Sequence, residues 1–128
     1  MKALKIDENS LTPIYVQIAD SIEEDILNDK LMEGNACYSQ LMIAKELKVN
    51  PATAAKGINL LVGHEILEKQ RGQAMTIAAD AKSKIIERKK KTDFKDKIEE
   101  LVKLAKRLHV SEEYLQNQIS KTFEESER

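Results

Sequence analysis

Two places in the sequence gather residues that can contact a phosphate or the edge of a base. The first begins at an Asn-Pro pair and holds Asn50, Thr53 and Lys56 at the start of an expected helix. The second holds Arg71 followed by Gly72, a residue that allows the backbone to approach a phosphate closely. Cations bind phosphates, and polar side chains read bases. The pattern is typical of a surface that binds nucleic acid.

Catalytic and metal-binding chemistry finds little support. Cys37, His64 and His109 lie far apart in the sequence, without the close spacing of metal ligands. Paired acids such as Glu99-Glu100 belong to charged helix faces. We expect no enzymatic activity, no metal and no cofactor. We expect Cys37 to be a small packed residue, and His109 to lie in a turn because histidine tolerates positive φ.

The composition favours a helical protein. The 128 residues contain 34% charged and 4% aromatic residues and no Trp, which argues against a sandwich or barrel. One cysteine cannot form an internal disulfide. No apolar run is long enough to cross a bilayer, and the first residues lack a signal-peptide core. We therefore expect a cytoplasmic protein with no membrane partner.

The net charge of −1 is unevenly distributed. Residues 1–38 hold three basic and eight acidic side chains, a balance of −5. Residues 39–79 hold five and three, and residues 80–128 hold thirteen and eleven, so each of these parts carries +2. The acidic excess lies upstream of the expected DNA-binding residues, so the distribution permits DNA binding.

Helical spacing predicts three helices before residue 79. Their expected caps are Thr12, Ser39 and Asn50, and Gly63 is the expected stop of the third. The expected inward faces are Tyr15, Ile18, Ile22 and Ile26, then Leu41, Ala44 and Leu47, then Ala54, Ile58 and Leu61. The runs "ILEKQ" and "AMTIA", separated by "RGQ", predict a small hairpin. This order is that of a winged helix-turn-helix.

The residues from Asp80 onward predict two further helices with an unpaired apolar stripe. The residues expected to form a dimer interface are Phe94, Ile98, Leu101, Leu104, Ala105, Leu108, Leu115 and Ile119. The run "ERKKKTD" fits either a solvated helix face or a joint between segments. The expected fold is mainly α with a small β-hairpin: a winged helix-turn-helix over 1–79, then a two-helix dimerisation segment over 80–128.

The chain resembles the GntR family of bacterial transcription regulators, and within it the short YtrA-like subfamily. The resemblance rests on "TPIYVQIADSIEEDIL", "SQLMIAKELKVNPATAAKGINLL" and "EILEKQRGQAMTIA". It implies a winged helix-turn-helix that binds palindromic operator DNA as a homodimer. Members of this subfamily commonly control nearby transport operons, often as repressors. They lack a large effector domain, which leaves the existence and identity of a small-molecule effector open.

The resemblance also implies which residues contact DNA. These are Ser39, Gln40, Asn50, Ala52, Thr53, Lys56, Lys69, Arg71, Gly72 and Gln73. The chain departs from the family pattern in both helices and in the wing. Tyr38 stands in place of a proline, Leu41 in place of an arginine, Ala52 in place of an asparagine and Ala74 in place of a glycine. An arginine lost from a base contact removes a bidentate donor worth about 1–3 kcal/mol.

Two functions remain open at this point. The first is a homodimeric, sequence-specific regulator, with repression the expected sign. The second is a family member with impaired DNA binding that acts by forming heterodimers with a competent paralogue. Leu41, Ala52 and Ala74 motivate the second function. The operator sequence and the regulated genes do not follow from the chain.

Overall fold

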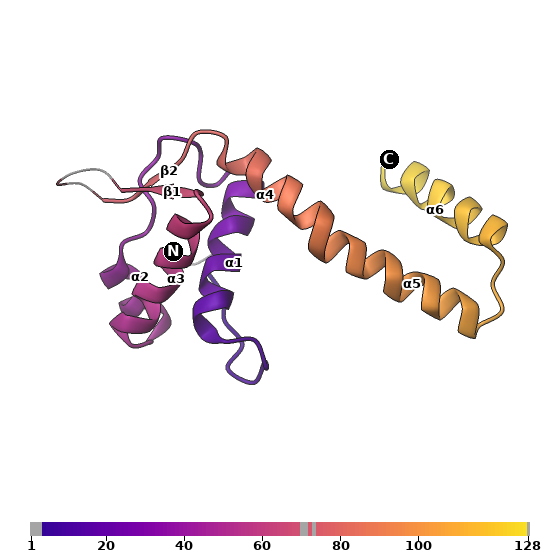
Figure 1. The fold of residues 1–128 in the computed structure, drawn as a ribbon, viewed down its shortest axis with the longest axis horizontal. Helices are drawn as coiled ribbons and strands as arrows, with labels where there is room; N and C mark the ends of the chain where they lie inside the picture. The colour runs from indigo at the N-terminus through magenta and orange to yellow at the C-terminus, as the bar shows by residue number, and fades with distance from the viewer. Residues whose placement is uncertain (1–3, 70–71, 73, 128) are drawn as a thin grey trace. The chain divides into compact units, whose positions relative to one another are not determined.

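The structure of the chain is a computed structural model that describes residues 4–69, 72 and 74–127. It forms two compact units, Met1–Arg88 and Lys89–Arg128 (Figure 1). The elements that begin in the first unit are α1 (Ile14–Leu27), α2 (Gln40–Leu47), α3 (Pro51–Gly63), β1 (Leu67–Glu68), β2 (Thr76–Ile77) and α4 (Ala81–Lys89), whose last residue lies past the division. The expected order of helix, helix, helix and hairpin is confirmed.

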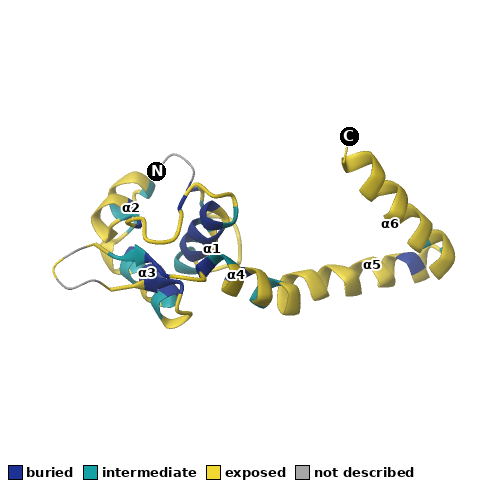
Figure 2. Ribbon diagram, turned by 90° about the horizontal axis from the view of Figure 1, so that it is seen from above, coloured by how far each residue is buried: buried dark blue, intermediate teal, exposed yellow. Residues whose placement is uncertain are grey.

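The core of the first unit lies between α1 and α3, where Figure 2 shows the buried faces. The expected inward residues Ile18, Ile22 and Ile26 of α1 are buried, as are Ala54, Ile58 and Leu61 of α3. Each large apolar side chain buried in this way contributes about 1.5–3 kcal/mol. The helical spacing in the sequence therefore predicted both faces correctly.

The start of α1 differs from the prediction. Pro13 occupies the cap position, and no side chain caps the helix, so the expected cap by Thr12 is wrong. The side chain of Gln17 stabilises this end instead. Its amide donates to the carbonyl oxygens of Thr12 and Asp7, at 2.8 and 3.0 Å. Proline fits this position because its ring fixes φ and it has no N–H to satisfy.

The caps of α2 and α3 are confirmed. Ser39 Oγ accepts from the Met42 N–H at 3.1 Å, and Asn50 Oδ1 accepts from the Ala52 N–H at 2.8 Å. The expected inward face of α2 is partly wrong, because Leu41 is 75% exposed. Ile43 fills the core position. A helix of eight residues buries a narrow stripe, and Leu41 lies two residues from Ile43, on a different face.

The helices α1 and α3 end in the same way. One residue after each C-cap takes a left-handed conformation: Asp29 after α1 and Glu65 after α3, each at φ 61°. In α3, the Glu65 N–H donates to the Val62 oxygen and the Ile66 N–H donates to the Leu61 oxygen, which is the Schellman pattern. Gly63 is the last helical residue, but Glu65 makes the turn.

The hairpin rests on a third segment that the sequence did not predict. β1 and β2 pair antiparallel, with Leu67 opposite Ile77. On its other side β2 pairs with residues 34–37. The Gly34 N–H donates to the Ile77 oxygen and the Cys37 N–H to the Met75 oxygen, both at 2.8 Å. The run "GNAC" has no strand alternation, so its pairing was not visible in the sequence.

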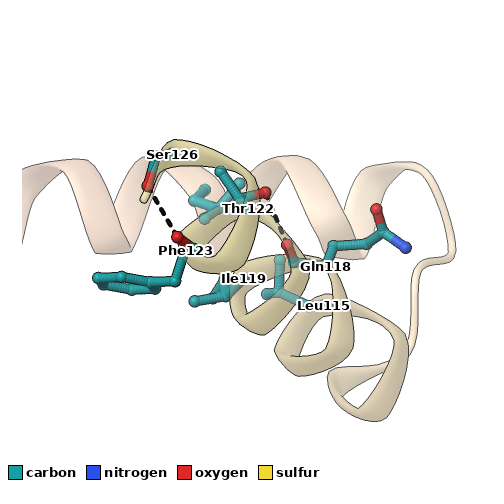
Figure 3. A pocket seen from close by; sticks show the side chains of 7 residues that line it. Leu115, Gln118, Ile119, Thr122, Phe123 and Ser126 are labelled. Carbon is teal, nitrogen blue, oxygen red and sulfur yellow. Dashed lines mark hydrogen bonds between the residues drawn. The ribbon is translucent and has the colours of Figure 1, made fainter. Parts of the chain in front are cut away.

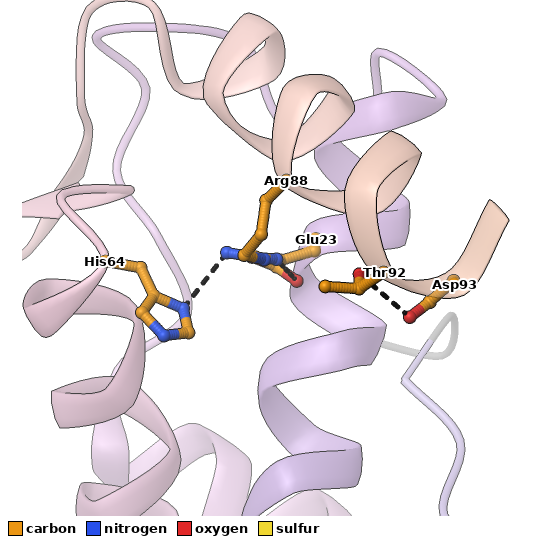
Figure 4. Close-up of polar contacts among 5 residues, drawn as sticks. All are labelled: Glu23, His64, Arg88, Thr92 and Asp93. Atoms are coloured by element: carbon orange, nitrogen blue, oxygen red, sulfur yellow. Dashed lines mark hydrogen bonds and ion pairs between the residues drawn. The ribbon is translucent and has the colours of Figure 1, made fainter. Parts of the chain in front are cut away.

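The helix α4 closes the core of the first unit. Ala81 and Ile85 are buried in it. Arg88 donates to both carboxylate oxygens of Glu23, which is 2% exposed. Arg88 also lies 3.0 Å from His64 Nδ1 (Figure 4). Since a guanidinium only donates, Nδ1 is the acceptor in this bond. The packing of the first unit thus includes residues beyond 79.

The second unit consists of a π-helical turn (Lys90–Phe94), α5 (Lys95–Arg107) and α6 (Glu112–Ser126). His109, at φ 57°, makes the turn between α5 and α6, as expected. Ser111 Oγ caps α6 by accepting from the Tyr114 N–H at 3.1 Å. The run "ERKKKTD" is helical and exposed over most of its length, and the division between the units falls within it.

Most apolar side chains of the second unit are exposed, and Figure 2 shows α5 and α6 mainly in the exposed colour. Phe94 and Leu108 are each 61% exposed, and Ala105 is buried. Across the part of the chain that the structure describes, no helix has the length and apolarity needed to cross a membrane.

Candidate nucleic-acid interface

The starts of α2 and α3 lie beside each other. The side-chain amide of Gln40, the first residue of α2, donates to the carbonyl oxygen of Pro51, the first residue of α3, at 3.1 Å. Around this bond Ser39, Asn50 and Ala52 are exposed. The N-terminal end of a helix attracts anions, because its free N–H groups and its dipole favour negative charge. The structure thus brings together the expected contact residues of α2 and α3.

Lys56 is the cation on the exposed side of α3. Its Nζ lies 4.2 Å from the centre of the Tyr15 ring, within the range of a cation–π interaction. Tyr15 is half-buried on α1. The ring therefore favours one placement of an otherwise flexible lysine. Thr53, one turn earlier, is half-buried.

Gly57 sets how closely α3 approaches α1. A Cβ at this position would lie 3.0 Å from Ile18 Cγ2 and 3.0 Å from the Tyr15 carbonyl oxygen. No side chain fits there without movement of a neighbour. The seating of α3, and with it the placement of Lys56, depends on this contact.

The hairpin supplies the third part of the interface. Lys69 and Ala74 are exposed, and Gly72 has φ +71°, the positive value expected for this turn. This conformation favours glycine over residues with a side chain. The expected contact residues Arg71 and Gln73 lie outside the described residues. Pairing with residues 34–37 ties the base of the hairpin to the first unit.

The electrostatic character of this surface is mixed. The exposed cations of α2, α3, their turn and the hairpin include Lys45, Lys48 and Lys69. Two carboxylates of the same elements, Glu46 and Glu68, are also exposed. With Lys56, the exposed cations exceed these two carboxylates only modestly, so contacts by specific side chains matter more here than a broad positive field.

Half-buried Tyr38 and buried Asp25, of which the sequence analysis missed the aspartate, hold the start of α2. The Tyr38 hydroxyl donates to Asp25 Oδ2 at 2.7 Å, and Asp25 is 4% exposed. Burial, together with this bond, raises the pKa of Tyr38. Burial also raises the pKa of the Cys37 thiol to about 11. Tyr38, in place of the family proline, therefore fastens the segment before α2 onto α1. Asp25 directly precedes Ile26, a residue of the expected inward face, and this position next to that face was the signal in the sequence that could have indicated its burial.

The residues considered as candidate metal ligands are Cys37, His64 and His109, and the structure places each of them separately. Among the described residues, no three His, Cys, Asp or Glu side chains lie close enough to hold a metal ion. His64 is a partner of Arg88, and His109 lies in a turn. Cys37 is buried and has the high thiol pKa given above, so it is a packed residue as expected.

Comparison with known proteins identifies relatives among bacterial regulators. No family profile matches the chain. The chain is 31% identical over 99 residues to the HTH-type transcriptional repressor YtrA of Bacillus subtilis, covering 77% of this chain and 75% of YtrA. It is 34% identical over 116 residues to the uncharacterised HTH-type regulator YhcF of the same organism, covering 91% of this chain and 93% of YhcF.

The solved structures that resemble this chain are also transcription regulators. A GntR-family regulator from Bacteroides thetaiotaomicron matches with a TM-score of 0.72 and 25% identity, covering 88% of this chain and 98% of that chain. BusR of Streptococcus agalactiae, solved in complex with busAB-promotor DNA, matches with a TM-score of 0.54 and 26% identity. That match covers 92% of this chain and 58% of BusR. These relatives are transcription regulators, not enzymes.

Proposed function

This chain belongs to the GntR family of helix-turn-helix transcription regulators, in its YtrA-like branch, and we propose that it represses transcription as a homodimer bound to a palindromic operator. DNA-binding regulation is the shared role of its relatives. We further propose that residues 1–79 contact DNA, that residues 80–128 form the dimer, and that the operator controls a transport operon.

The observation that carries the DNA-binding part is the joined start of α2 and α3. The bond between Gln40 and Pro51 presents two capped helix ends together, with Lys56 exposed on α3. Phosphate contacts orient such a surface on a duplex, and side chains near the helix start then reach bases in the major groove. BusR, a structural relative, has been solved in complex with its promotor DNA.

The homodimer is supported by the exposed apolar residues of α5 and α6. A groove of about 490 Å³ lies within the second unit, lined by Leu101, Leu115, Gln118, Ile119, Thr122, Phe123 and Ser126 (Figure 3). A second copy would cover these residues and remove their apolar surface from water. Two joined heads would then bind two half-sites at once, which raises the effective concentration of each for its site.

A binding assay tests the proposal. Fluorescence anisotropy is measured with the DNA upstream of the gene for this chain and with a scrambled duplex of the same composition. We expect a preference for the upstream DNA, an affinity that falls steeply with added salt, and nuclease protection of two symmetric half-sites. Equal binding of both duplexes at low salt, or binding that ignores salt, contradicts the proposal.

One observation favours a second function. Leu41 and Ala74, which replace polar or flexible positions of the family, are both exposed, so no core contact explains them. Such replacements would be tolerated in a chain that pairs with a competent paralogue and weakens the DNA binding of the mixed dimer. Protection of a palindrome by the purified chain alone rejects this alternative. Mixed dimers with no such protection support it.

A further inference from the structure

Leu41 is a large apolar side chain in contact with water at the start of α2. It is 75% exposed, and the neighbouring Met42 is 48% exposed. Single exposed leucines are common on protein surfaces, and Leu11 is another in this chain. Exposure alone therefore says little about Leu41, and its location decides what it can do.

The location is the joined helix starts. Gln40, directly before Leu41, bonds to Pro51, directly before Ala52. Ala52 is exposed as well. The oxygens of Ser39 and Asn50 accept from backbone N–H groups of their own helices. Leu41 and Ala52, the second residues of the two helices, are thus both apolar and exposed, with Met42 beside Leu41.

The major groove offers one apolar group to such a side chain. Guanine, cytosine and adenine present hydrogen-bonding atoms there, whereas thymine also presents its C5-methyl group. Leucine has no donor for guanine O6 and N7. We propose that Leu41, supported by Ala52, contacts a thymine methyl group in each half-site and so makes this regulator select thymine at that position. This proposal rests on the DNA-binding function proposed above.

The charges around Leu41 favour DNA over a protein as the occupant. Lys45 and Lys48 on α2 and its turn, and Lys56 on α3, are exposed. These lysines suit the phosphates that border a groove. The exposed apolar side chains here are also few, namely Leu41, Met42 and Ala52, whereas protein-binding patches extend over several hundred Å².

Replacing thymine by uracil tests the contact, because uracil pairs like thymine and lacks only the C5-methyl group. The probe is a duplex selected by the full-length chain from a pool of random DNA. Each thymine is then replaced singly in both half-sites. We expect one position where uracil weakens binding by about fourfold per half-site, the effect of one buried methyl group. In Leu41→Ala this loss should fall to less than twofold.

Two control variants sharpen the result. Leu11→Ala removes an exposed leucine elsewhere and should leave the uracil effect unchanged. Leu41→Arg, selected anew, should enrich guanine in place of thymine at the same position, because arginine donates to O6 and N7. Leu41 is exposed, so these changes leave the core intact, and thermal unfolding verifies this.

The outcomes separate the two proposals. Specific binding without any sensitive thymine, or a uracil effect that persists fully in Leu41→Ala, overturns the role of Leu41 and leaves the DNA-binding function standing. A random pool that yields no enriched duplex overturns the DNA-binding function, and the role of Leu41 with it.

Discussion

Single side chains around residue 38 decide how the start of α2 is held. The Tyr38 hydroxyl satisfies buried Asp25, and Cys37 packs beside them. A buried carboxylate that loses its partner costs about 1–3 kcal/mol or more. A proline would restrict the backbone before α2, whereas Tyr38 holds this segment through its hydrogen bond to Asp25. The positions of Ser39 and Gln40 therefore depend on that hydrogen bond.

The buried thiol of Cys37 makes stability depend on pH in alkali. Its pKa is raised from 9.0 to about 11, so the folded chain keeps the proton longer than the unfolded chain. The stabilisation is complete below pH 9 and is lost as the pH rises through about 11. We expect the free energy of unfolding, measured with urea, to fall by about 2–3 kcal/mol over this range.

The matched variant for this prediction is Cys37→Ala. The bond from Tyr38 to Asp25 is kept in both proteins, and the charge on Cys37 raises the pKa of Tyr38 only once the thiol has ionised, so the difference between the two pH profiles up to about pH 11 reports the thiol. Parallel profiles for wild-type and Cys37→Ala would contradict the assignment.

Lys56 should contribute one phosphate contact in each half-site. We expect Lys56→Met to lower the slope of log affinity against log salt by about one per half-site. Lys82 is the control, because it pairs with Asp29 at 2.9 Å, beyond the opposite end of α1 from Tyr15. Lys82→Met should leave the slope unchanged. The slope is obtained from anisotropy titrations at several salt concentrations, and equal slopes for both variants would remove Lys56 from the interface.

Prediction from sequence worked best for residues with one strong local preference. Ser39 and Asn50 were predicted as caps because their short polar side chains reach backbone N–H groups. Leu41 was wrongly placed inside, since apolar character does not tell which of two helix faces a short helix buries. Buried Glu23 and Asp25 were missed, because their partners Arg88 and Tyr38 lie far away in sequence.

At the scale of elements, the contact between α1 and α3 is the most demanding. We expect Gly57→Ala to lower the free energy of unfolding by about 1–2 kcal/mol, because strain against Ile18 and Tyr15 exceeds the gain in helix propensity. Gly63→Ala is the matched control. It also lies in α3 but has no heavy atom within 4 Å of its Cβ position, so it should stabilise slightly. Urea unfolding of both variants checks the sign, and a neutral Gly57→Ala would contradict the close approach.

The turn after α3 carries a strained residue that can be relieved. Glu65 has φ 61°, a conformation that glycine adopts more easily. We expect Glu65→Gly to raise the midpoint of thermal unfolding, corresponding to about 0.5–1 kcal/mol. Glu68→Gly, in β1, should lower it, since glycine weakens a strand. A loss of stability in Glu65→Gly would show that the left-handed turn is not retained.

The elements themselves could be predicted, but not all of their pairings. Spacing of apolar residues indicated α1, α3, the hairpin and the two C-terminal helices. The pairing of residues 34–37 with β2 joins segments about 40 residues apart through backbone atoms alone. Such a contact leaves no mark on side-chain pattern. The turn at His109 was predictable because it depends on the tolerance of a single residue, histidine, for positive φ.

For the whole molecule, association through the second unit is the property to test. Leu101, in α5, is 40% exposed, and Leu108, the residue that follows α5, is 61% exposed. We expect Leu101→Asp or Leu108→Asp to give monomers in sedimentation, because a charge would have to be buried without a partner. Operator affinity should fall steeply in the same variants. Asn117→Asp adds an equal charge on α6 and should remain dimeric. A wild-type chain that is itself monomeric would refute the dimer.

The bond between Arg88 and buried Glu23 has a consequence for the order of events in synthesis. Domains commonly fold from the N-terminus while the ribosome is still adding residues. Here the partner of the Glu23 carboxylate, Arg88, is synthesised 65 residues later. The first unit therefore completes its core only after Arg88 has left the exit tunnel of the ribosome. By then, much of the second unit has already been translated. The folding of the first unit and the synthesis of the second unit are therefore close in time.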